Sequence, residues 1–244
     1  MDQDEYDRMA AVEETLWWYR ALHRIQQQRL AALRLAPTGH VLDAGCGTGG
    51  LLRFLRQQMP ALVLHGLEFN AEAAGMARAK SGLPVTEGSV NAMPFGDAAF
   101  DAIVSDDVLC HAGVDQAAAL AEFLRCLKPG GRLLLNLPAY SWMNSPHDIH
   151  VHNVRRYTKR QAMQRLRQAG FAIEAAGYWN SLLFPLMLLH RMSVGKMQTA
   201  SDVRPLAPWL NTALFSIARQ EEWLNRYGLG LPFGGSVWLQ ARRA

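Results

Sequence analysis

The sequence is poor in the features that mark secreted and membrane-spanning proteins. It has three cysteines, Cys46, Cys110 and Cys126, without a CxxC pair, which favours a reducing compartment over a disulfide framework. The N-terminus, MDQDEYDRMA, is acidic, whereas a signal peptide is basic and then apolar. The longest apolar run, Leu182–Leu189, is far too short to cross a bilayer. We therefore expect a cytoplasmic chain without stable membrane insertion.

A strong excess of charge of one sign is also missing. The chain has 25 Lys and Arg against 21 Asp and Glu, a formal net charge of +4, and no basic stripe. This balance argues against a nucleic-acid partner. Half of the residues are hydrophobic and 19% are charged, so a chain of 244 residues can bury the core of one large domain.

Short apolar segments alternate with segments of helical periodicity over much of the chain. Expected strands lie at 40–44, 62–68, 84–89, 100–107, 131–138, 171–179 and 235–243. Asn70 is a plausible helix cap, and Thr158 with Gln161 forms a capping-box pattern. The alternation predicts an α/β fold, a doubly wound and mostly parallel seven-stranded sheet with helices on both faces, in a single domain 1–244.

Two segments lie outside this alternation. Residues 13–35 predict one N-terminal helix within a helical cap, 1–36. Residues 180–234 form a long insert before the last strand, with an apolar helix expected to break at Pro185. The insert could be a lid that walls a substrate pocket; a second core layer or a dimer seam would account for it equally well.

The segment VLDAGCGTGG, Val41–Gly50, carries a glycine-rich loop after the first strand, matching both GxGxxG and GxGxG. The loop alone is a weak signal, since dinucleotide-binding folds share it. Its neighbours are more specific. Asp43 suits a ligand with an ammonium group, Glu68 ends the second strand where a carboxylate can accept both ribose hydroxyls, and Ser89 with Val90 could contact an adenine edge. An NAD-dependent oxidoreductase would not explain Asp43.

Together with GLEFN, GSVNAMPFGDAAFDAIVSDDVLCH and LKPGGRLLL, the segment resembles the class I S-adenosylmethionine-dependent methyltransferases, the type 11 group in particular. The resemblance implies S-adenosyl-L-methionine as cofactor, with no metal needed. It implies that Asp43, Gly45, Gly47 and Gly49 hold the methionine part, Glu68 the ribose, and Ser89 and Val90 the adenine, with Asp106 lining the pocket. Ser89 stands where the family usually has Asp, so the adenine amino contact could instead come from the Val90 backbone.

The segment EETLWWYRALHR resembles the N-terminal helix that many members fold over the cofactor. Trp18 and Tyr19 are the residues we expect to contact the cofactor. An equally good alternative is that the aromatic side chains only anchor this helix on the sheet.

The acceptor is expected beyond the carboxyl ends of the fourth and fifth strands. His147, which Asp148 could orient, is the first candidate general base, and His111 the second. The cluster of His147, His150 and His152 could alternatively bind a metal or be ordinary polar loop residues.

Four further residues are candidate substrate contacts. Arg155 and Arg156 could bind a carboxylate or phosphate, or could be solvated or paired with other side chains. Tyr157 and Trp179 complete this predicted set.

The sequence as a whole predicts methyl transfer to a small molecule at oxygen, nitrogen or carbon. The acceptor could be apolar or aromatic, or could carry an anionic group. A nucleic-acid substrate is disfavoured, because the fourth strand ends in SDDV and not in the segment that holds a flipped base. The alternative is a non-catalytic protein that keeps the fold to bind the cofactor or a partner; a homodimer remains an option.

Overall fold

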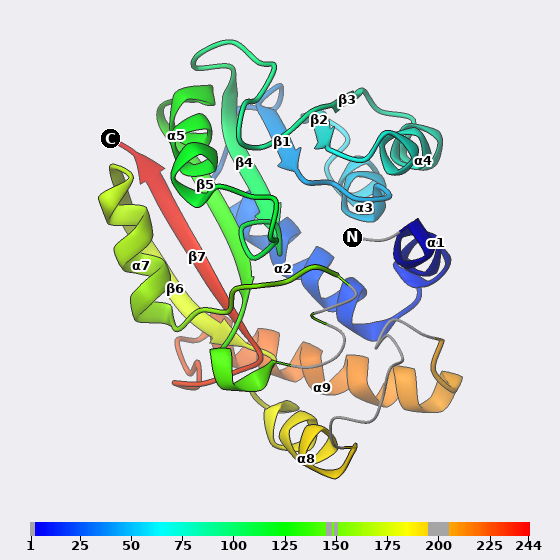
Figure 1. Ribbon diagram of the computed structural model, residues 1–244. Coiled ribbons are helices and arrows are strands. Elements are labelled where there is room, and N and C mark those ends of the chain that lie inside the picture. Colours follow the sequence, from blue (N-terminus) through cyan, green and yellow to red (C-terminus); the bar gives the residue numbers. More distant parts are fainter. Residues whose placement is uncertain (1–2, 145–147, 149–150, 195–204) are drawn as a thin grey trace.

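A computed structural model describes residues 3–144, 148, 151–194 and 205–244. Its centre is a seven-stranded sheet in the order β3-β2-β1-β4-β5-β7-β6 (Figure 1). Strands β1 to β5 are parallel, and β7 runs antiparallel to both β5 and β6. The predicted α/β fold with a mostly parallel sheet is confirmed. The strands are β1 (His40–Ala44), β2 (Val63–Glu68), β3 (Val85–Glu87), β4 (Phe100–Asp106), β5 (Leu127–Pro138), β6 (Phe171–Trp179) and β7 (Ser236–Arg243).

Helices cover both faces of the sheet, and each face has its own apolar core. The helices between the strands are α3 (Gly50–Gln58), α4 (Ala71–Ser81), α5 (Gln116–Cys126) and α7 (Lys159–Gln168). Side chains of α5 and α7, such as Phe123 and Leu166, belong to one core, while side chains of α3 and α4, such as Leu52 and Ala77, belong to the other. The two predicted caps are present, with Asn70 accepting from the Ala73 amide and Thr158 in a capping box with Gln161.

The N-terminal segment differs from the prediction of a single helix over residues 13–35. The structure has two helices, α1 (Gln3–Val12) and α2 (Trp17–Ala32). The chain breaks between them because the Glu13 carboxylate is bound to the glycine-rich loop, and because the Trp17 amide donates to Asn211 Oδ1 at 2.8 Å. Leu16, at the N-cap position of α2, supplies no side-chain acceptor, so Asn211 satisfies an amide that a cap would otherwise bind.

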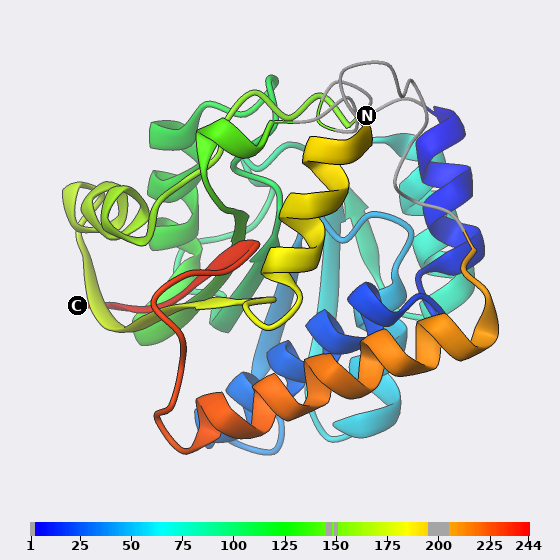
Figure 2. The ribbon, with the colours of Figure 1, turned by 90° about the horizontal axis from the view of Figure 1, so that it is seen from below.

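The insert contains two helices, α8 (Phe184–Val194) and α9 (Pro208–Arg226). Pro185 does not break α8, as the sequence had suggested, but lies in its first turn, where a missing amide donor costs nothing. Helix α9 runs beside α2, and Arg24 of α2 pairs with Glu222 of α9 at 3.3 Å (Figure 2). In the described parts of the chain, no helix combines the length and apolar character required to cross a membrane.

Candidate active site

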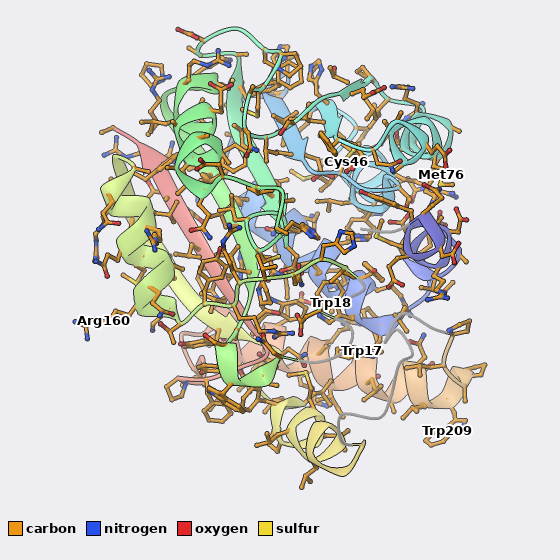
Figure 3. The ribbon with its side chains drawn as sticks, in the orientation of Figure 1. Trp17, Trp18, Cys46, Met76, Arg160 and Trp209 are labelled. Atoms are coloured by element: carbon orange, nitrogen blue, oxygen red, sulfur yellow. The ribbon has the colours of Figure 1, made fainter. Side chains whose placement is uncertain are left out.

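A cavity of about 660 Å³ lies at the carboxyl ends of the parallel strands. It is bounded by the glycine-rich loop after β1, the tips of β2 and β4, helices α1 and α2, and residues of the insert. Trp18 at the start of α2 and Cys46 of the loop belong to its wall, and Figure 3 labels both. In doubly wound sheets, ligands bind outside the carboxyl ends of the strands, so this cavity is the candidate active site.

The loop owes its shape to glycines at positions that no other residue could take. Gly45 has φ +86°, and a Cβ there would lie 2.3 Å from the Val108 side chain. Gly49 has φ +88°, and a Cβ there would lie 2.8 Å from the backbone of Ala77 in α4. Gly45 and Gly47 line the cavity, whereas Gly49 allows α3 and α4 to pack closely behind it. The loop thus presents bare backbone to a ligand.

Asp43, at the tip of β1, carries a buried carboxylate in the cavity wall. Burial raises its pKa well above the usual range, and the negative charges of Asp106 and Glu68 add to the effect. Its Oδ2 has no hydrogen-bond partner. A buried carboxylate without a protein partner is costly unless a cation offsets it. The ammonium group of S-adenosylmethionine fits this requirement.

Glu68, at the tip of β2, is held by three donors. Its Oε2 accepts from the Gly47 amide at 2.9 Å. Its Oε1 accepts from the Asn70 amide at 3.1 Å and from the Tyr6 hydroxyl of α1 at 2.9 Å. A carboxylate offers about four lone-pair positions, so Glu68 can still accept from a ribose. The sequence did not single out Tyr6, whose hydroxyl binds the same Glu68 carboxylate that is predicted to bind the ribose.

Ser89 and Val90 also line the cavity, just beyond β3. The Ser89 hydroxyl accepts from the Asn91 amide at 3.1 Å, which fixes the turn, and Val90 is buried. The predicted adenine contacts therefore lie in the same cavity as Asp43 and Glu68.

Glu13, which the sequence did not single out, fastens the N-terminal helices to this loop. Its buried carboxylate accepts from the Thr48 hydroxyl at 2.5 Å and the Gly50 amide at 3.1 Å, and it is ion-paired with Lys80 of α4. No short-range pattern could have revealed this role, because Thr48 and Lys80 are remote in sequence. Trp18 and Tyr19, the predicted cofactor contacts, follow on α2 and line the cavity.

Asp106, the last residue of β4, and Asp107, which follows it, carry adjacent carboxyl groups, and both residues line the cavity. Burial raises the pKa of Asp106 to about 7, although the Gln26 amide and the Arg29 charge act in the opposite direction. Burial, together with the charge of Asp106, raises the pKa of Asp107 to about 8. Both Asp107 oxygens accept from the Asn136 side-chain amide, at 3.1 and 3.2 Å. Asp107 was not predicted as a site residue.

The two histidines predicted as bases are differently placed. His111 lines the cavity, and burial lowers its pKa to about 4, so its imidazole is neutral at neutral pH. His147 lies outside the described residues, as does His150. Within the described part of the chain, no group of three His, Cys, Asp or Glu could hold a metal ion.

Of the four predicted substrate contacts, only Arg156 is among the residues that line the cavity. Its guanidinium forms a bidentate pair with Asp148 at 2.8 and 2.9 Å. Arg155 instead donates to the carbonyls of His111 and Val114 at 2.7 and 3.0 Å.

Tyr157 and Trp179 also bind protein groups behind the wall. The Tyr157 hydroxyl donates to the Leu109 carbonyl at 2.9 Å, and the Trp179 indole donates to Asn136 Oδ1 at 2.5 Å. Arg155, Tyr157 and Trp179 thus form hydrogen bonds within the protein, to backbone carbonyls and to Asn136, and are not among the residues that line the cavity.

Residues 42–135 match the model of a family described as a methyltransferase domain. Over 176 residues the chain is 31% identical to 24-methylenesterol C-methyltransferase 2 of Oryza sativa subsp. japonica, an alignment covering 66% of this chain and 47% of that protein. The chain therefore spans about half the length of this curated relative.

Solved structures share the fold over most of the chain. An S-adenosylmethionine-dependent methyltransferase from Thermotoga maritima superimposes with a TM-score of 0.61 at 20% identity, covering 99% of this chain and 95% of that one. Geranyl diphosphate C-methyltransferase from Streptomyces coelicolor A3(2), solved with S-adenosyl-L-homocysteine, gives 0.61 at 17% identity over 90% and 75%. Residues 42–135 therefore match a methyltransferase domain, and most of the chain shares the fold of these solved methyltransferases.

Proposed function

We propose that the protein transfers a methyl group from S-adenosylmethionine to a small-molecule acceptor. The observation that carries this proposal is the Asp43 carboxylate, buried with an unpartnered Oδ2 in the same cavity as Glu68. One carboxylate matches the ammonium and the other the ribose hydroxyls of a single nucleoside. The cavity is of the size that small-molecule sites usually have.

The remaining cofactor contacts follow from the wall of the cavity. The backbone of Gly45 and Gly47 would hold the methionine part, and Ser89 and Val90 would contact the adenine. Trp18 and Tyr19 of the helical cap, 1–36, would cover the cofactor. When bound, S-adenosylmethionine supplies a methyl group already activated on a positive sulfur, so the protein has to position the acceptor and exclude water.

The acceptor would lie between the tip of β4 and the insert, 180–234. Asn180, Met187 and Leu206 of the insert line the cavity, which supports its role as a lid over the substrate. His111 lines this part of the cavity and is the described histidine candidate for proton acceptance, but the lowering of its pKa to about 4 makes its neutral imidazole a weak base. The Arg156 guanidinium is paired with Asp148, so an anionic acceptor would have to compete for it.

The proposal is tested by calorimetry with S-adenosylhomocysteine, followed by incubation of acceptor mixtures with methyl-¹³C-labelled cofactor and detection of new methyl signals by NMR. We expect binding and transfer to occur. Binding without transfer to any acceptor would favour the rival function, a non-catalytic cofactor-binding protein. No binding at all would contradict both.

A further inference from the structure

Asp107 lines the cavity but is not needed for any of the proposed contacts with the cofactor. The ammonium and the ribose account for Asp43 and Glu68, and Asp106 is bound by Gln26 and lies near the charge of Arg29. Asp107 follows β4 with φ 54°, a left-handed conformation that Asp tolerates better than most residues. Asp107 and His111, both from the segment that follows β4, line the cavity.

The neighbouring amide fixes the chemistry of this carboxylate. An indole N–H can only donate, so the Trp179 ring requires Asn136 to turn its Oδ1 toward it. The amide NH₂ of Asn136 must then face Asp107, to which it donates twice. Asp107 is therefore positioned as an acceptor, with lone pairs left for a ligand.

A second acceptor that lines the cavity has no protein partner at all. Asn180 follows Trp179 at the end of β6, is only 6% exposed, and lines the cavity. Its Oδ1 is buried without a hydrogen-bond partner. Burying an amide oxygen without a hydrogen-bond partner is unfavourable, so a ligand that donates to it is favoured.

Fixed positive charge on this side of the cavity is scarce. Among the described lining residues, the only Lys or Arg is Arg156, and its guanidinium is paired with Asp148. His111 is neutral at neutral pH. A ligand that brings a positive charge and several N–H donors favours the ionised form of Asp107 and so complements this wall. An anion would meet buried carboxyl groups, with no unpaired Lys or Arg among the described lining residues.

We propose that the acceptor is a primary or secondary amine that binds in its protonated form, with its nitrogen held by the Asp107 carboxylate and the Asn180 amide oxygen. This inference rests on the proposed methyl transfer and names its substrate class. Neither residue belongs to the set that the sequence predicted.

Asp107 is also placed to prepare the nitrogen for methylation. One proton passes from the ammonium to a carboxylate oxygen, leaving a neutral amine with a free lone pair. That lone pair forms the new N–C bond as the methyl carbon's bond to sulfur breaks, with its electron pair remaining on sulfur. The product amine carries the positive charge, and Asp107 returns its proton to solvent. The bound ammonium favours the ionised form of Asp107, and because burial raises the pKa of this carboxyl to about 8, its carboxylate is a stronger base than an ordinary one.

The test uses the protein saturated with S-adenosylhomocysteine and two matched sets of probes. One set is 2-phenylethylamine, 2-phenylethanol and 3-phenylpropionate; the other is hexylamine, hexanol and hexanoate. We expect each amine to raise the melting temperature most and to bind at least tenfold more tightly than its matched alcohol and acid. Asp107→Asn, which keeps size and can still accept from Asn136, should remove this preference and leave the S-adenosylhomocysteine dissociation constant within twofold.

The matched control is Glu72→Gln, which removes an exposed carboxylate in the first turn of α4 and should keep the amine preference. The inference fails if the alcohols or acids stabilise the protein as much as the amines, if no amine stabilises it, or if Asp107→Asn retains the preference. Failure to bind S-adenosylhomocysteine would instead overturn the proposed function, so the two failures are distinguishable.

Discussion

The Tyr6 hydroxyl donates a 2.9 Å hydrogen bond to Glu68 Oε1 and so joins the first helix to the tip of β2. A hydrogen bond from a hydroxyl to a carboxylate is a strong one, and burial together with the neighbouring Glu68 carboxylate raises the pKa of Tyr6 above its usual range. The cofactor ribose and this phenol would therefore draw on the same carboxylate.

Tyr6→Phe should consequently tighten S-adenosylhomocysteine binding by about two- to fivefold. The substitution removes a hydroxyl that competes with the ribose for Glu68, and the competing hydrogen bond contributes roughly 0.5–1 kcal/mol. Glu68→Ala should weaken it more than tenfold. Calorimetry on both variants checks the pair. Weaker binding by Tyr6→Phe would show that the hydroxyl contacts the nucleoside instead of competing with it.

Asp43→Asn should weaken binding of S-adenosylhomocysteine by at least tenfold while leaving 5′-methylthioadenosine binding nearly unchanged. The second ligand has the ribose and adenine but no ammonium, so it does not need Asp43. Glu68→Ala should weaken both ligands. Equal losses for the two ligands in Asp43→Asn would contradict the assignment of Asp43 to the ammonium.

Glu13→Ala should lower the free energy of unfolding by roughly 3–5 kcal/mol, since it leaves Lys80 without its carboxylate and the Gly50 amide without its acceptor. Urea denaturation measures this. Glu14→Ala is the control: its ion pair with Arg53 is exposed on both sides, so a change below about 1 kcal/mol is expected. Similar losses in the two variants would mean that Glu13 does not hold the loop.

Gly49→Ala should destabilise the protein by about 2–4 kcal/mol, because its Cβ would lie 2.8 Å from the Ala77 backbone at a φ of +88°. Gly75→Ala, in the middle of α4 with no atom near its Cβ, should instead be neutral or stabilise by about 0.5–1 kcal/mol. Thermal melts of the two variants compare them directly. A tolerated alanine at Gly49 would contradict the close approach of α3 and α4.

The contribution of Asp106 and Asp107 to the stability of the ligand-free protein should fall as the pH rises from about 4 to about 8. Asp107 has a higher pKa when folded, about 8, than when unfolded, so the unfolded chain ionises first and gains stability over that interval. Burial raises the pKa of Asp106 to about 7, with the same sign. Arg156 acts against the shift at Asp107, while the negative charge of Asp148 adds to it.

Asp107→Asn should therefore raise the melting temperature by roughly 2–6 °C at pH 8.5 and by much less at pH 5. Scanning fluorimetry at both values, with Glu72→Gln as control, makes the comparison. An equal gain at both values would show that the carboxylate is not held in its protonated form by the fold.

The sheet could be predicted from the sequence because its signals are local. The strand at 40–44, the glycines that follow it and the Thr158 capping box each depend on neighbours in the chain. The break between α1 and α2 could not be predicted, since it depends on Glu13 reaching Thr48 and on Asn211 of the insert capping α2.

The candidate site divides in the same way. Asp43 and Glu68 lie at the carboxyl ends of two strands that the sequence pattern predicts, so their positions could be predicted from the sequence. Arg155 and Tyr157 looked available in the sequence, but the fold turns them toward backbone carbonyls of the segment after β4. The role proposed for Asp107 could not be predicted, because it depends on hydrogen bonds that involve Asn136 and Trp179, which lie on two other strands.

The antiparallel β7 brings both ends of residues 180–234 to one place, because Trp179 at the end of β6 pairs with Ser236 at the start of β7. The segment between these two residues therefore leaves and re-enters the sheet at neighbouring points. Replacing it with a segment of another length should change the loop-closure entropy of folding only slightly. A chimera that carries another methyltransferase's segment between these positions should keep its nucleoside affinity while acquiring a new acceptor range.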